Sequence, residues 1–316
     1  MRFFKNTNID FIGKRKIAFL ISAVLIIVGV VSLVINHGPK YGIDFTGGVS
    51  IELNLTPVTE NAKPVNIQQI RDILEKENIK DVEIQEIKDT EGRSLVLIKT
   101  KAVELDGVKL SDKILNIIKK NFPDNINPET FIRMQQEVGP RIGEELKGKA
   151  LLAIFWALVG IILYIWWRFE FTFGIAAVVA LFHDVLITVG IFSITGKEMS
   201  LPVVAALLTI VGYSLNDTIV VFDRIREDLK VYRRESYVNV FNHSINETLS
   251  RTIITSLTTF VVVLSLYLFG GTVIHDFAFA LLIGVIVGTY SSIFVASPIM
   301  VEHFNRRQKL VGSKRK

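Results

Sequence analysis

Asp217 is an acidic residue inside an apolar segment, and its position suits chemistry better than any other in this sequence. It lies in the stretch Leu201–Phe222, which is otherwise apolar enough to cross a membrane. A carboxylate at the centre of a membrane helix costs roughly 2.5 to 3.5 kcal/mol on insertion scales, and such groups most often carry protons or ions. We therefore interpret Asp217, with Asn216 beside it, as part of a titrating relay. The alternative is a structural hydrogen bond or a buried ion pair between helices.

A candidate cation for this carboxylate comes at the start of the next apolar segment. Arg251 opens that segment, and hydroxyl side chains occupy much of its first two turns. Such a surface suits packing against other helices or lining a wet path better than it suits lipid. The alternative reading of Arg251 is an anchor at the cytoplasmic membrane surface, where basic residues are enriched. The hydroxyl residues are Thr252, Thr255, Ser256, Thr258 and Thr259.

A second pair of ionisable residues, His183 and Asp184, falls near the middle of another apolar segment. Two such groups at the membrane midplane require a polar interior. They could take part in proton transfer, or they could form a mutual hydrogen bond that fixes a helix bundle. His275 and Asp276 lie at a segment end and are better interpreted as interfacial residues.

The motifs of common enzyme sites are missing from the sequence. There is no cysteine, no HExxH and no nucleophile elbow. Gly143–Ala150 resembles a phosphate-binding loop, but Ala150 lacks the hydroxyl that would hold Mg²⁺. We therefore expect no ATPase or hydrolase site, no metal and no cofactor, and we do not expect an enzyme.

Six apolar segments have the length that a membrane helix needs, which is about 20 residues with a range near 17–25. Half of all residues are hydrophobic, and they are concentrated in these blocks. We interpret the first segment as an uncleaved anchor, because no small-residue cleavage site follows it. The segments are Ile17–Ile35, Ala150–Trp167, Phe171–Ile194, Leu201–Phe222, Thr252–Phe269 and Phe277–Met300.

Basic residues near the segment ends set the expected orientation. The tail 1–16 has five Lys and Arg residues, the loop 223–251 has six and the tail 302–316 has six, whereas the loop 195–200 has one. Both termini are therefore expected in the cytoplasm. This predicts a cytoplasmic tail at 1–16, a first span at 17–35, an extracytoplasmic domain with linkers at 36–149, a five-helix bundle at 150–300 that includes the cytoplasmic loop 223–251, and a basic cytoplasmic tail at 301–316.

The distribution of charge argues against a nucleic-acid partner. Residues 37–147 carry 16 Lys and Arg against 19 Asp and Glu, a net of −3, so the rest of the chain must carry +8 to reach the total of +5. This excess lies beside membrane segments, where contact with membrane lipid explains it.

For the loop 223–251 we weigh a surface-lying amphipathic segment against an extension of the fourth and fifth helices, and we favour the extension.

The outer domain shows alternating and helical periodicities in the order β-α-β-β-α-β, which is the ferredoxin-like arrangement. We expect a turn at Glu91 and Gly92 between the second and third strands. The elements are expected at Val49–Leu55, Asn66–Asn78, Asp81–Lys88, Leu95–Lys99, a helix around Leu110–Ile118, and Thr130–Val138.

Two glycine patterns concern the backbone. Gly42, Gly47 and Gly48 surround Asp44 in the linker between the first span and the first outer strand, where glycine supplies the freedom for a tight entry. Gly284 and Gly288 form a GxxxG pattern in the last span, which supports close packing of helices.

Three of these motifs together resemble the SecF family, the smaller half of the SecD–SecF accessory complex of bacterial protein export. Tyr41–Gly48 (YGIDFTGG) is similar to the family's signature after the first helix. His183–Val185 is similar to its third-helix motif, and Gly212–Glu227 (GYSLNDTIVVFDRIRE) to its long fourth-helix signature. The resemblance covers the whole chain and implies an α-helical polytopic membrane protein with six transmembrane helices and an extracytoplasmic ferredoxin-like domain between helices 1 and 2.

The resemblance also implies a function. SecF-like proteins belong to the resistance-nodulation-division superfamily and use the proton-motive force to promote export of polypeptides. This implies a SecD-like chain, the Sec translocon (SecYEG) and an unfolded secretory polypeptide as partners, in the bacterial cytoplasmic membrane. The family's proton path corresponds here to Asp217 and Arg251, with Asp184 as a further member. Asn216, His183, Thr255 and Thr259 are then supporting polar residues.

Two other functions are compatible with the same elements. The chain could be half of a lipid or small-molecule transporter of the same superfamily, which would need a substrate pocket in the bundle. It could also be a purely structural subunit of the translocon, which should tolerate replacement of Asp217 by Asn.

Overall fold

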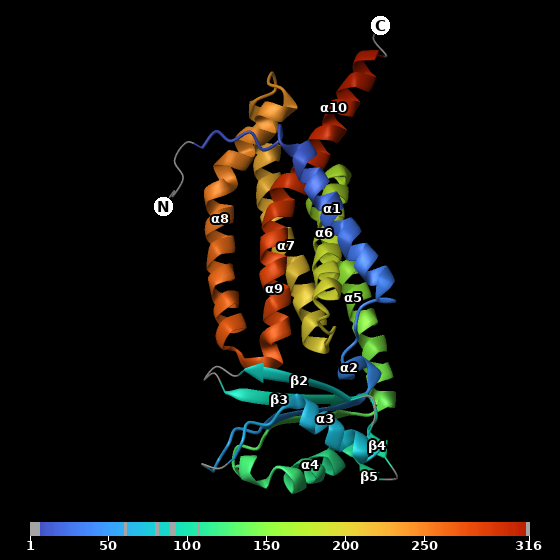
Figure 1. The fold of residues 1–316 in the computed structure, drawn as a ribbon. Coiled ribbons are helices and arrows are strands. Elements are labelled where there is room, and N and C mark those ends of the chain that lie inside the picture. The colour runs from blue at the N-terminus through green and yellow to red at the C-terminus, as the bar shows by residue number, and fades with distance from the viewer. Residues whose placement is uncertain (1–6, 60–61, 80–81, 89–92, 106–107, 314–316) are drawn as a thin grey trace. The chain divides into compact units, whose positions relative to one another are not determined.

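The computed structural model describes residues 7–59, 62–79, 82–88, 93–105 and 108–313. The chain divides into two compact units, which are treated separately below (Figure 1). One unit is helical and contains residues 1–40 and 153–316. The other contains residues 41–152 and is built on a β-sheet.

Six helical segments in the described chain are long and apolar enough to span a membrane, which confirms the predicted fold class of a multi-pass membrane protein. The sixth span is composite, since α9 continues through a π-helical turn, η2, into α10. The segments are α1 (Arg15–Ile35), α5 (Pro140–Arg168), α6 (Phe171–Thr195), α7 (Leu201–Val231), α8 (Tyr237–Phe269), and α9 (Gly271–Ser291) with η2 (Ser292–Ala296) and α10 (Ser297–Ser313).

Several of these helices extend beyond their apolar segments. The segment 223–251 is helical except for residues 232–236, so it extends α7 and α8, as favoured above, and does not lie apart as an amphipathic segment. These extensions remain helical because their apolar residues pack together, with Ile225 of α7 and with Phe241 and Ile245 of α8 buried in one cluster. The tail that was expected from residue 301 is likewise helical as far as Ser313.

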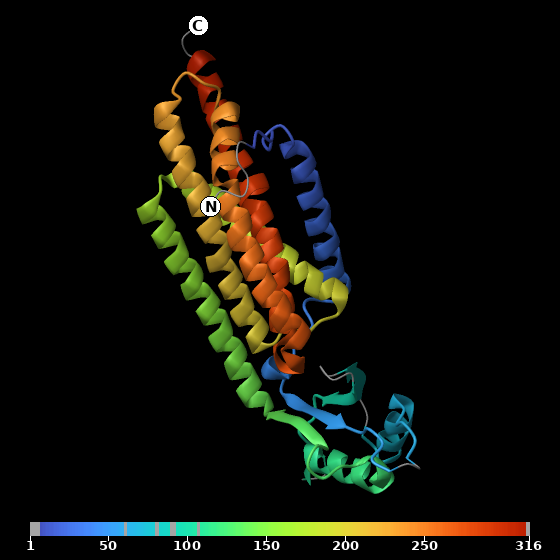
Figure 2. The ribbon, with the colours of Figure 1, turned by 90° about the vertical axis from the view of Figure 1, so that its left-hand side faces the viewer.

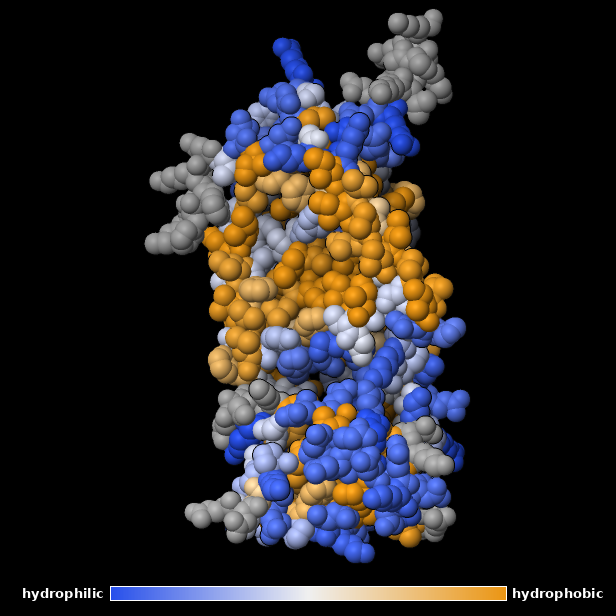
Figure 3. Space-filling model, viewed as in Figure 1, coloured by the Kyte–Doolittle hydropathy of each residue, from blue (hydrophilic) through white to orange (hydrophobic). Residues whose placement is uncertain are grey.

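The core of the helical unit is made by α6, α7 and α9, with α1 packed on α6 and with α8 packed on α7 and α9. In Figure 2, α1 and α5 lie on opposite sides of this bundle. About half of the span of α6 and of α9 is buried, whereas only 6% of the span of α5 is. On the face seen in Figure 3, the helices carry a hydrophobic band. Side chains in this band would contact lipid or another membrane protein.

Glycines permit the two closest helix contacts. A Cβ atom on Gly29 of α1 would lie 2.9 Å from Cα of Gly190 on α6, so neither helix could carry a side chain at the crossing. A Cβ atom on Gly288 of α9 would lie 3.0 Å from Cβ of Ser214 on α7. Gly284 also faces α7, where its Cβ atom would overlap Ile210. The GxxxG pattern thus brings α9 close to α7, as small residues at this spacing allow.

The second unit is an antiparallel sheet in the order β2-β3-β1-β6, with one helix between β1 and β2 and another between β3 and β6. This is the predicted ferredoxin-like arrangement. In register, Ile51 of β1 pairs with Ile98 of β3, which pairs with Ile84 of β2. These side chains and those of the two helices form one core. The elements are β1 (Gly48–Asn54), α3 (Ile67–Lys76), β2 (Val82–Lys88), β3 (Ser94–Thr100), α4 (Leu110–Asn121) and β6 (Ile132–Val138).

Small elements of this unit were not predicted. They are α2 (Ile43–Thr46) in the glycine-rich linker, the short strands β4 (Glu104–Leu105) and β5 (Val108–Lys109), and the 3₁₀ turn η1 (Pro123–Asn125). Strands of two residues are too short to show a periodicity. The expected turn at Glu91 and Gly92 lies outside the described residues.

Candidate functional site

Asp217 lies in the interior of the helical unit, where three helices meet. Its side chain is 4% exposed, and Ser256 of α8 donates a hydrogen bond to its Oδ2 over 3.3 Å. Thr289 of α9 approaches Ser256, with 2.7 Å between the two hydroxyl oxygens. A chain of hydroxyls thus leads from α9 through α8 to the carboxylate on α7. Since a hydroxyl can both donate and accept, such a chain can hold and pass a proton.

Arg251 lies close enough to Asp217 to act on it electrostatically, but the two side chains do not form an ion pair. The Arg251 side chain is exposed. Within the described part of the chain, its guanidinium has no hydrogen bond or ion pair. Its charge is therefore available both to Asp217 and to a group outside this chain.

The supporting residues named from the sequence are only partly brought to this carboxylate. Asn216 is exposed and therefore does not face the buried side of α7. Thr255 donates to the carbonyl of Arg251 on its own helix over 2.8 Å, and Thr259 is half-buried. The direct partner is Ser256, which the sequence showed only as one of five hydroxyl residues. Helical spacing could have singled out Ser256 only if Thr289, the residue of α9 that faces it, had been known.

One further hydroxyl on this face of α8 is free within the described chain. Thr252 lies one turn before Ser256 and is 1% exposed. Its Oγ1 atom is buried and has no hydrogen-bond partner among the described residues. A buried hydroxyl without a partner costs free energy unless water or another group satisfies it. It is therefore a position at which water or a neighbouring group could bind.

Asp184 forms a second polar centre with many more hydrogen bonds. Its Oδ2 atom accepts from Ser214 of α7 over 2.5 Å and from Ser291 of α9 over 2.8 Å. Its Oδ1 atom lies 2.9 Å from Nδ1 of His183. Asp184 is 1% exposed and His183 is 5% exposed. The pair thus has the polar interior that its position requires, and Ser214, one turn before Asp217, brings the two centres onto the same helix.

The second centre reaches α1 through His183. The Nε2 atom of His183 lies 2.9 Å from Oγ of Ser22, which lies 3.1 Å from the hydroxyl of Tyr290 on α9. Tyr290 donates to the carbonyl of Ala18 over 2.7 Å. Neither Ser22 nor Tyr290 stood out in the sequence, because a single serine or tyrosine in a membrane span is common.

The glycine-rich linker is shaped by its backbone. Gly42 caps the short helix α2, while Gly47 and Gly48 have φ angles of 73° and 135°, which favour glycine. A Cβ atom on Gly47 would lie 2.7 Å from Cα of Pro140. Asp44 is 8% exposed, and Gln136 of β6 donates to its Oδ1 over 2.9 Å. Within this unit the linker is therefore a tightly packed junction.

Ion pairs link the helices at both ends of the helical unit. Asp276 is paired with Lys197 over 2.6 Å and lies 3.5 Å from Nδ1 of His275, where interfacial residues were expected. At the end that holds residues 232–236, Asp228, His243 and Glu247 have ligand atoms close enough for a metal ion. Arg224, however, pairs with both Asp228 and Glu247. Its guanidinium already neutralises the acidic groups that a cation would need.

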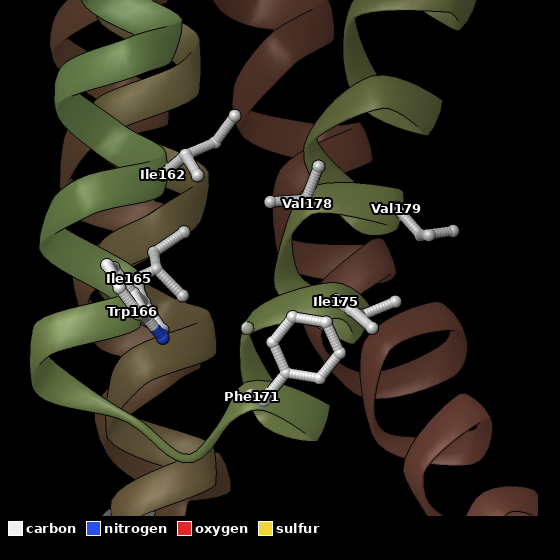
Figure 4. Close-up of a pocket in the computed structure, with 8 residues that line it drawn as sticks. Ile162, Ile165, Trp166, Phe171, Ile175, Val178 and Val179 are labelled. Atoms are coloured by element: carbon white, nitrogen blue, oxygen red, sulfur yellow. The ribbon is translucent and has the colours of Figure 1, made fainter.

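A groove lies between α5 and α6 (Figure 4). It has a volume of about 390 Å³ and an apolar lining, with Trp166 on the α5 side and Phe171 on the α6 side. Gly174 helps to form it, because a Cβ atom there would lie 3.1 Å from Ile165. No carboxylate or hydroxyl lines the groove, so it suits an apolar occupant and is chemically unlike the two polar centres.

Comparisons with known proteins agree with this arrangement. The family model described as protein export membrane protein SecD/SecF, C-terminal, matches residues 118–306, and the SecD/SecF GG motif matches residues 32–57. The first match covers more than half of the chain. This chain belongs to the SecD/SecF family. Its two polar centres, between α6, α7, α8 and α9, all lie within the residues matched by the first model.

Full-length relatives in this family are similar along nearly the whole chain. The protein translocase subunit SecF of Thermodesulfovibrio yellowstonii is 46% identical over 300 residues, which is 93% of this chain and 94% of that protein. That of Rhodothermus marinus is 44% identical over 308 residues, covering 96% of this chain and 95% of that protein. Protein translocase subunit SecDF of Thermus thermophilus is 39% identical over 96% of this chain, but the match is only 40% of that longer protein.

Solved structures show the same fold. The crystal structure of SecDF from Thermus thermophilus, described as a translocon-associated membrane protein, matches with a TM-score of 0.80 and 38% identity, over 95% of this chain and 39% of that chain. A second structure of SecDF, in a super-membrane-facing form, matches with a TM-score of 0.67 and 37% identity, over 99% of this chain and 41% of that chain. The SecD/SecF family therefore accounts for both units of this chain.

Proposed function

We propose that this chain is a SecF-like subunit that uses the proton-motive force to promote polypeptide export. The observation that supports this most directly is Asp217, a buried carboxylate that has, among the described residues, one hydroxyl donor and a nearby arginine without an ion pair. A carboxylate held by a full set of partners would gain little from changing its protonation state. Asp217 instead has one described donor, so a change of partner would cost it little hydrogen bonding.

The proposed coupling is electrostatic. Ionised Asp217 attracts Arg251 on α8, and protonation removes that attraction, so that α8 can repack against α7. A proton that crosses 100 mV releases about 2.3 kcal/mol, which is enough to shift such an equilibrium. The hydroxyls of Ser256 and Thr289 then bring a proton to the carboxylate, and Asp184 with His183 forms a second position on the path.

The proposed setting is the bacterial cytoplasmic membrane with both termini in the cytoplasm. The end of the helical unit with α10 and residues 232–236 carries the basic residues, which supports this orientation through the positive-inside rule. The unit of residues 41–152 is then extracytoplasmic, where it can meet an emerging unfolded polypeptide.

A SecD-like chain is the proposed direct partner. Asn216 and Arg251 are exposed on membrane-spanning helices, and polar groups facing lipid are costly. In Figure 3, a paler and more polar patch interrupts the hydrophobic band between α8 and α9. A second membrane chain that covers this face would remove the cost. The Thermus relative named SecDF, a single longer chain, is consistent with such an assembly. SecYEG and membrane lipid are the further proposed partners.

The proposed chemistry uses the proton gradient as its energy source and needs no cofactor. No bond in a substrate is made or broken, so we propose a coupling subunit and not an enzyme. The hydroxyls, carboxylates and imidazole of the two centres suffice for binding and transferring a proton.

The test is export of a reporter precursor into inverted membrane vesicles that contain the partner chains, at saturating ATP. Asp217→Asn should assemble but lose the proton-dependent part of export, and an uncoupler should then have no further effect. Combining Asn216→Asp with Asp217→Asn returns a carboxyl group to α7, but at the exposed neighbouring position. The uncoupler sensitivity of export is then compared between this double variant and Asp217→Asn alone. If Asp217→Asn keeps full proton-dependent export, Asp217 is a structural hydrogen-bonding group and the proposal fails at this residue.

A half-transporter of the same superfamily is the second candidate, and the apolar groove between α5 and α6 favours it. Its substrate would be a lipid or an apolar small molecule. Filling the groove with Val178→Trp should then abolish transport. If proton-dependent polypeptide export survives this substitution, the groove is not part of the export function.

A further inference from the structure

The segment that precedes the first membrane helix is bound to the helical unit along its length. Residues 7–13, here called the N-terminal strap, precede α1 and run across the start of α8. A tail that served only to supply positive charge would need no such contacts. The strap is instead held by hydrogen bonds on one side and by apolar packing on the other.

Two asparagines on α8 bind the backbone of the strap. Asn246 accepts from the Ile9 N–H over 2.9 Å and donates to the Ile9 carbonyl over 2.9 Å. Asn242 accepts from the Ile12 N–H over 3.0 Å and donates to the Asp10 carboxylate over 2.8 Å. Each amide therefore uses both its donor and its acceptor, which Asn can do and Ser, Asp or Lys cannot do in the same geometry.

Asp10 also closes the strap on itself. The Gly13 N–H donates to Asp10 Oδ1 over 2.7 Å. This backbone donor, followed by the Asn242 side chain, lowers the pKa of Asp10, so the carboxyl is an ionised acceptor at neutral pH. The strap thus has a defined turn that presents Ile9 and Ile12 to the two asparagines.

The apolar side of the strap connects α8 to α9. Ile12 is fully buried, and Phe11 is 7% exposed. Both belong to the apolar cluster that includes Ile245 of α8, and the Phe11 ring packs edge-on against Phe294 with 5.6 Å between centroids. Phe294 lies in η2, the π-helical turn that ends α9. Such turns often occur at functional sites within helices.

The strap therefore joins the two helices that provide the hydroxyls next to Asp217. Asn246 lies on α8 five residues before Arg251, and Phe294 lies five residues after Thr289 on α9. Only 17% of the span of α8 is buried, and its main contacts are with α7, α9 and α10. At the same end, Ser244 Oγ donates to Asp228 over 2.7 Å and binds α8 to α7, and the Phe241 ring lies 6.2 Å from that of Phe304 on α10.

We propose that the N-terminal strap is a clamp that holds α8 against α9, and that Asn242 and Asn246 are positioning residues for the Asp217 site. The strap sets where Arg251 and Ser256 stand relative to Asp217. Its effect on export rests on the proposed proton-coupled function, whereas its effect on the helix positions does not.

A test of helix position uses the absence of native cysteine. The Ser256 and Asp217 side chains are in contact, so the rate of disulfide formation in a chain with Asp217→Cys and Ser256→Cys reports the fit of α8 against α7. Adding Asn242→Ala and Asn246→Ala should lower this rate about fivefold or more, because the loss of one or two hydrogen bonds lowers the population of the native helix arrangement by about this factor. Asn239→Ala, an exposed change on the same helix, is the matched control and should leave the rate unchanged.

A test of function uses the chain with its native Asp217 and Ser256. Asn242→Ala with Asn246→Ala should lower the proton-dependent part of export, and Asn239→Ala should not. In a chain with Ile9→Cys and Asn246→Cys, a short thiol-to-thiol crosslinker should restore the export that the uncrosslinked chain lacks. This rescue separates a released strap from a misfolded protein.

The outcomes distinguish the two proposals. If the strap variant keeps both the disulfide rate and proton-dependent export, or if crosslinking restores nothing, the clamp is wrong. If the disulfide rate falls while export in the unmodified chain does not respond to an uncoupler, the clamp stands and the proposed proton coupling fails.

Discussion

The two buried carboxylates differ in how completely they are hydrogen-bonded, and this difference separates their roles. Asp184 has two hydroxyl donors and the His183 ring, whereas Asp217 has one hydroxyl donor. A buried carboxylate with several donors is fixed in place, because each donor would lose its partner if the group moved. We infer that Asp217 is the group that changes partners, whereas Asp184, the second position on the proposed path, also keeps α6, α7 and α9 in register.

Ser256→Ala should weaken proton-dependent export without preventing assembly. The change removes the hydrogen bond to Asp217 and interrupts the chain of hydroxyls from Thr289. Thr255→Ala is the control, since Thr255 donates only to its own helix. The measurement is export at several membrane potentials in vesicles. Equal export by both variants would show that the hydroxyl on α8 is not part of the path.

Asp184→Ala should destabilise the helical unit. It leaves Ser214 without its acceptor, at a cost of about 1–3 kcal/mol for a buried donor, whereas Ser291 keeps the Gly288 carbonyl over 3.2 Å. Asp184→Asn keeps one acceptor oxygen and should cost less. Thermal unfolding of the complex in detergent measures both variants. A melting temperature for Asp184→Ala equal to that of the unsubstituted chain would mean that this centre does not hold the bundle.

At the scale of elements, the crossing of α1 and α6 is set by two glycines. A Cβ atom on Gly29 would come within 2.9 Å of the Gly190 backbone. Gly29→Val should therefore force the helices apart, cost about 1–3 kcal/mol as overpacking does, and lengthen the contact between Ser22 and His183. Gly160→Val on α5 is the control, since a Cβ atom there meets nothing within 4 Å.

The measurement for this crossing is the thermal stability of the purified complex, together with proteolysis of α1. Cleavage should begin earlier in Gly29→Val than in Gly160→Val. The prediction is wrong if the two variants unfold at the same temperature, because the crossing of α1 and α6 would then accommodate the valine side chain by a small shift of α1.

At the scale of the whole molecule, the exposed polar groups on α7 and α8 call for a second chain. Asn216→Cys is a sensitive probe because the chain has no other cysteine. Co-expression with a SecD-like chain should slow labelling of this position by a membrane-permeant thiol reagent severalfold. Thr272→Cys, near the start of α9, serves as the reference position. Equal labelling of position 216 with and without the partner would place the interface elsewhere.

Much of the architecture follows from the sequence. Apolar segments of membrane length, alternating strands and basic termini predict the six spans and the βαββαβ unit, because lipid and a half-buried sheet impose strict periodicities. Asp217 and Asp184 are visible for the same reason, since a carboxylate in an apolar run is conspicuous. The extension of α7 and α8 into residues 223–251 was also predicted correctly.

What only the tertiary structure decided is which side chains meet. Ser256, Thr289, Ser214 and Ser291 are ordinary hydroxyl residues in the sequence, and they gain a role only because packing places them around two carboxylates from other helices. Tyr290 gains its role through Ser22 of α1. The same holds for Ile9 and Ile12, whose strap binds Asn242 and Asn246 more than 200 residues away. Sequence periodicity reports which face of a helix is apolar, whereas the rotation and crossing of helices depend on glycine contacts and hydrogen bonds between distant segments.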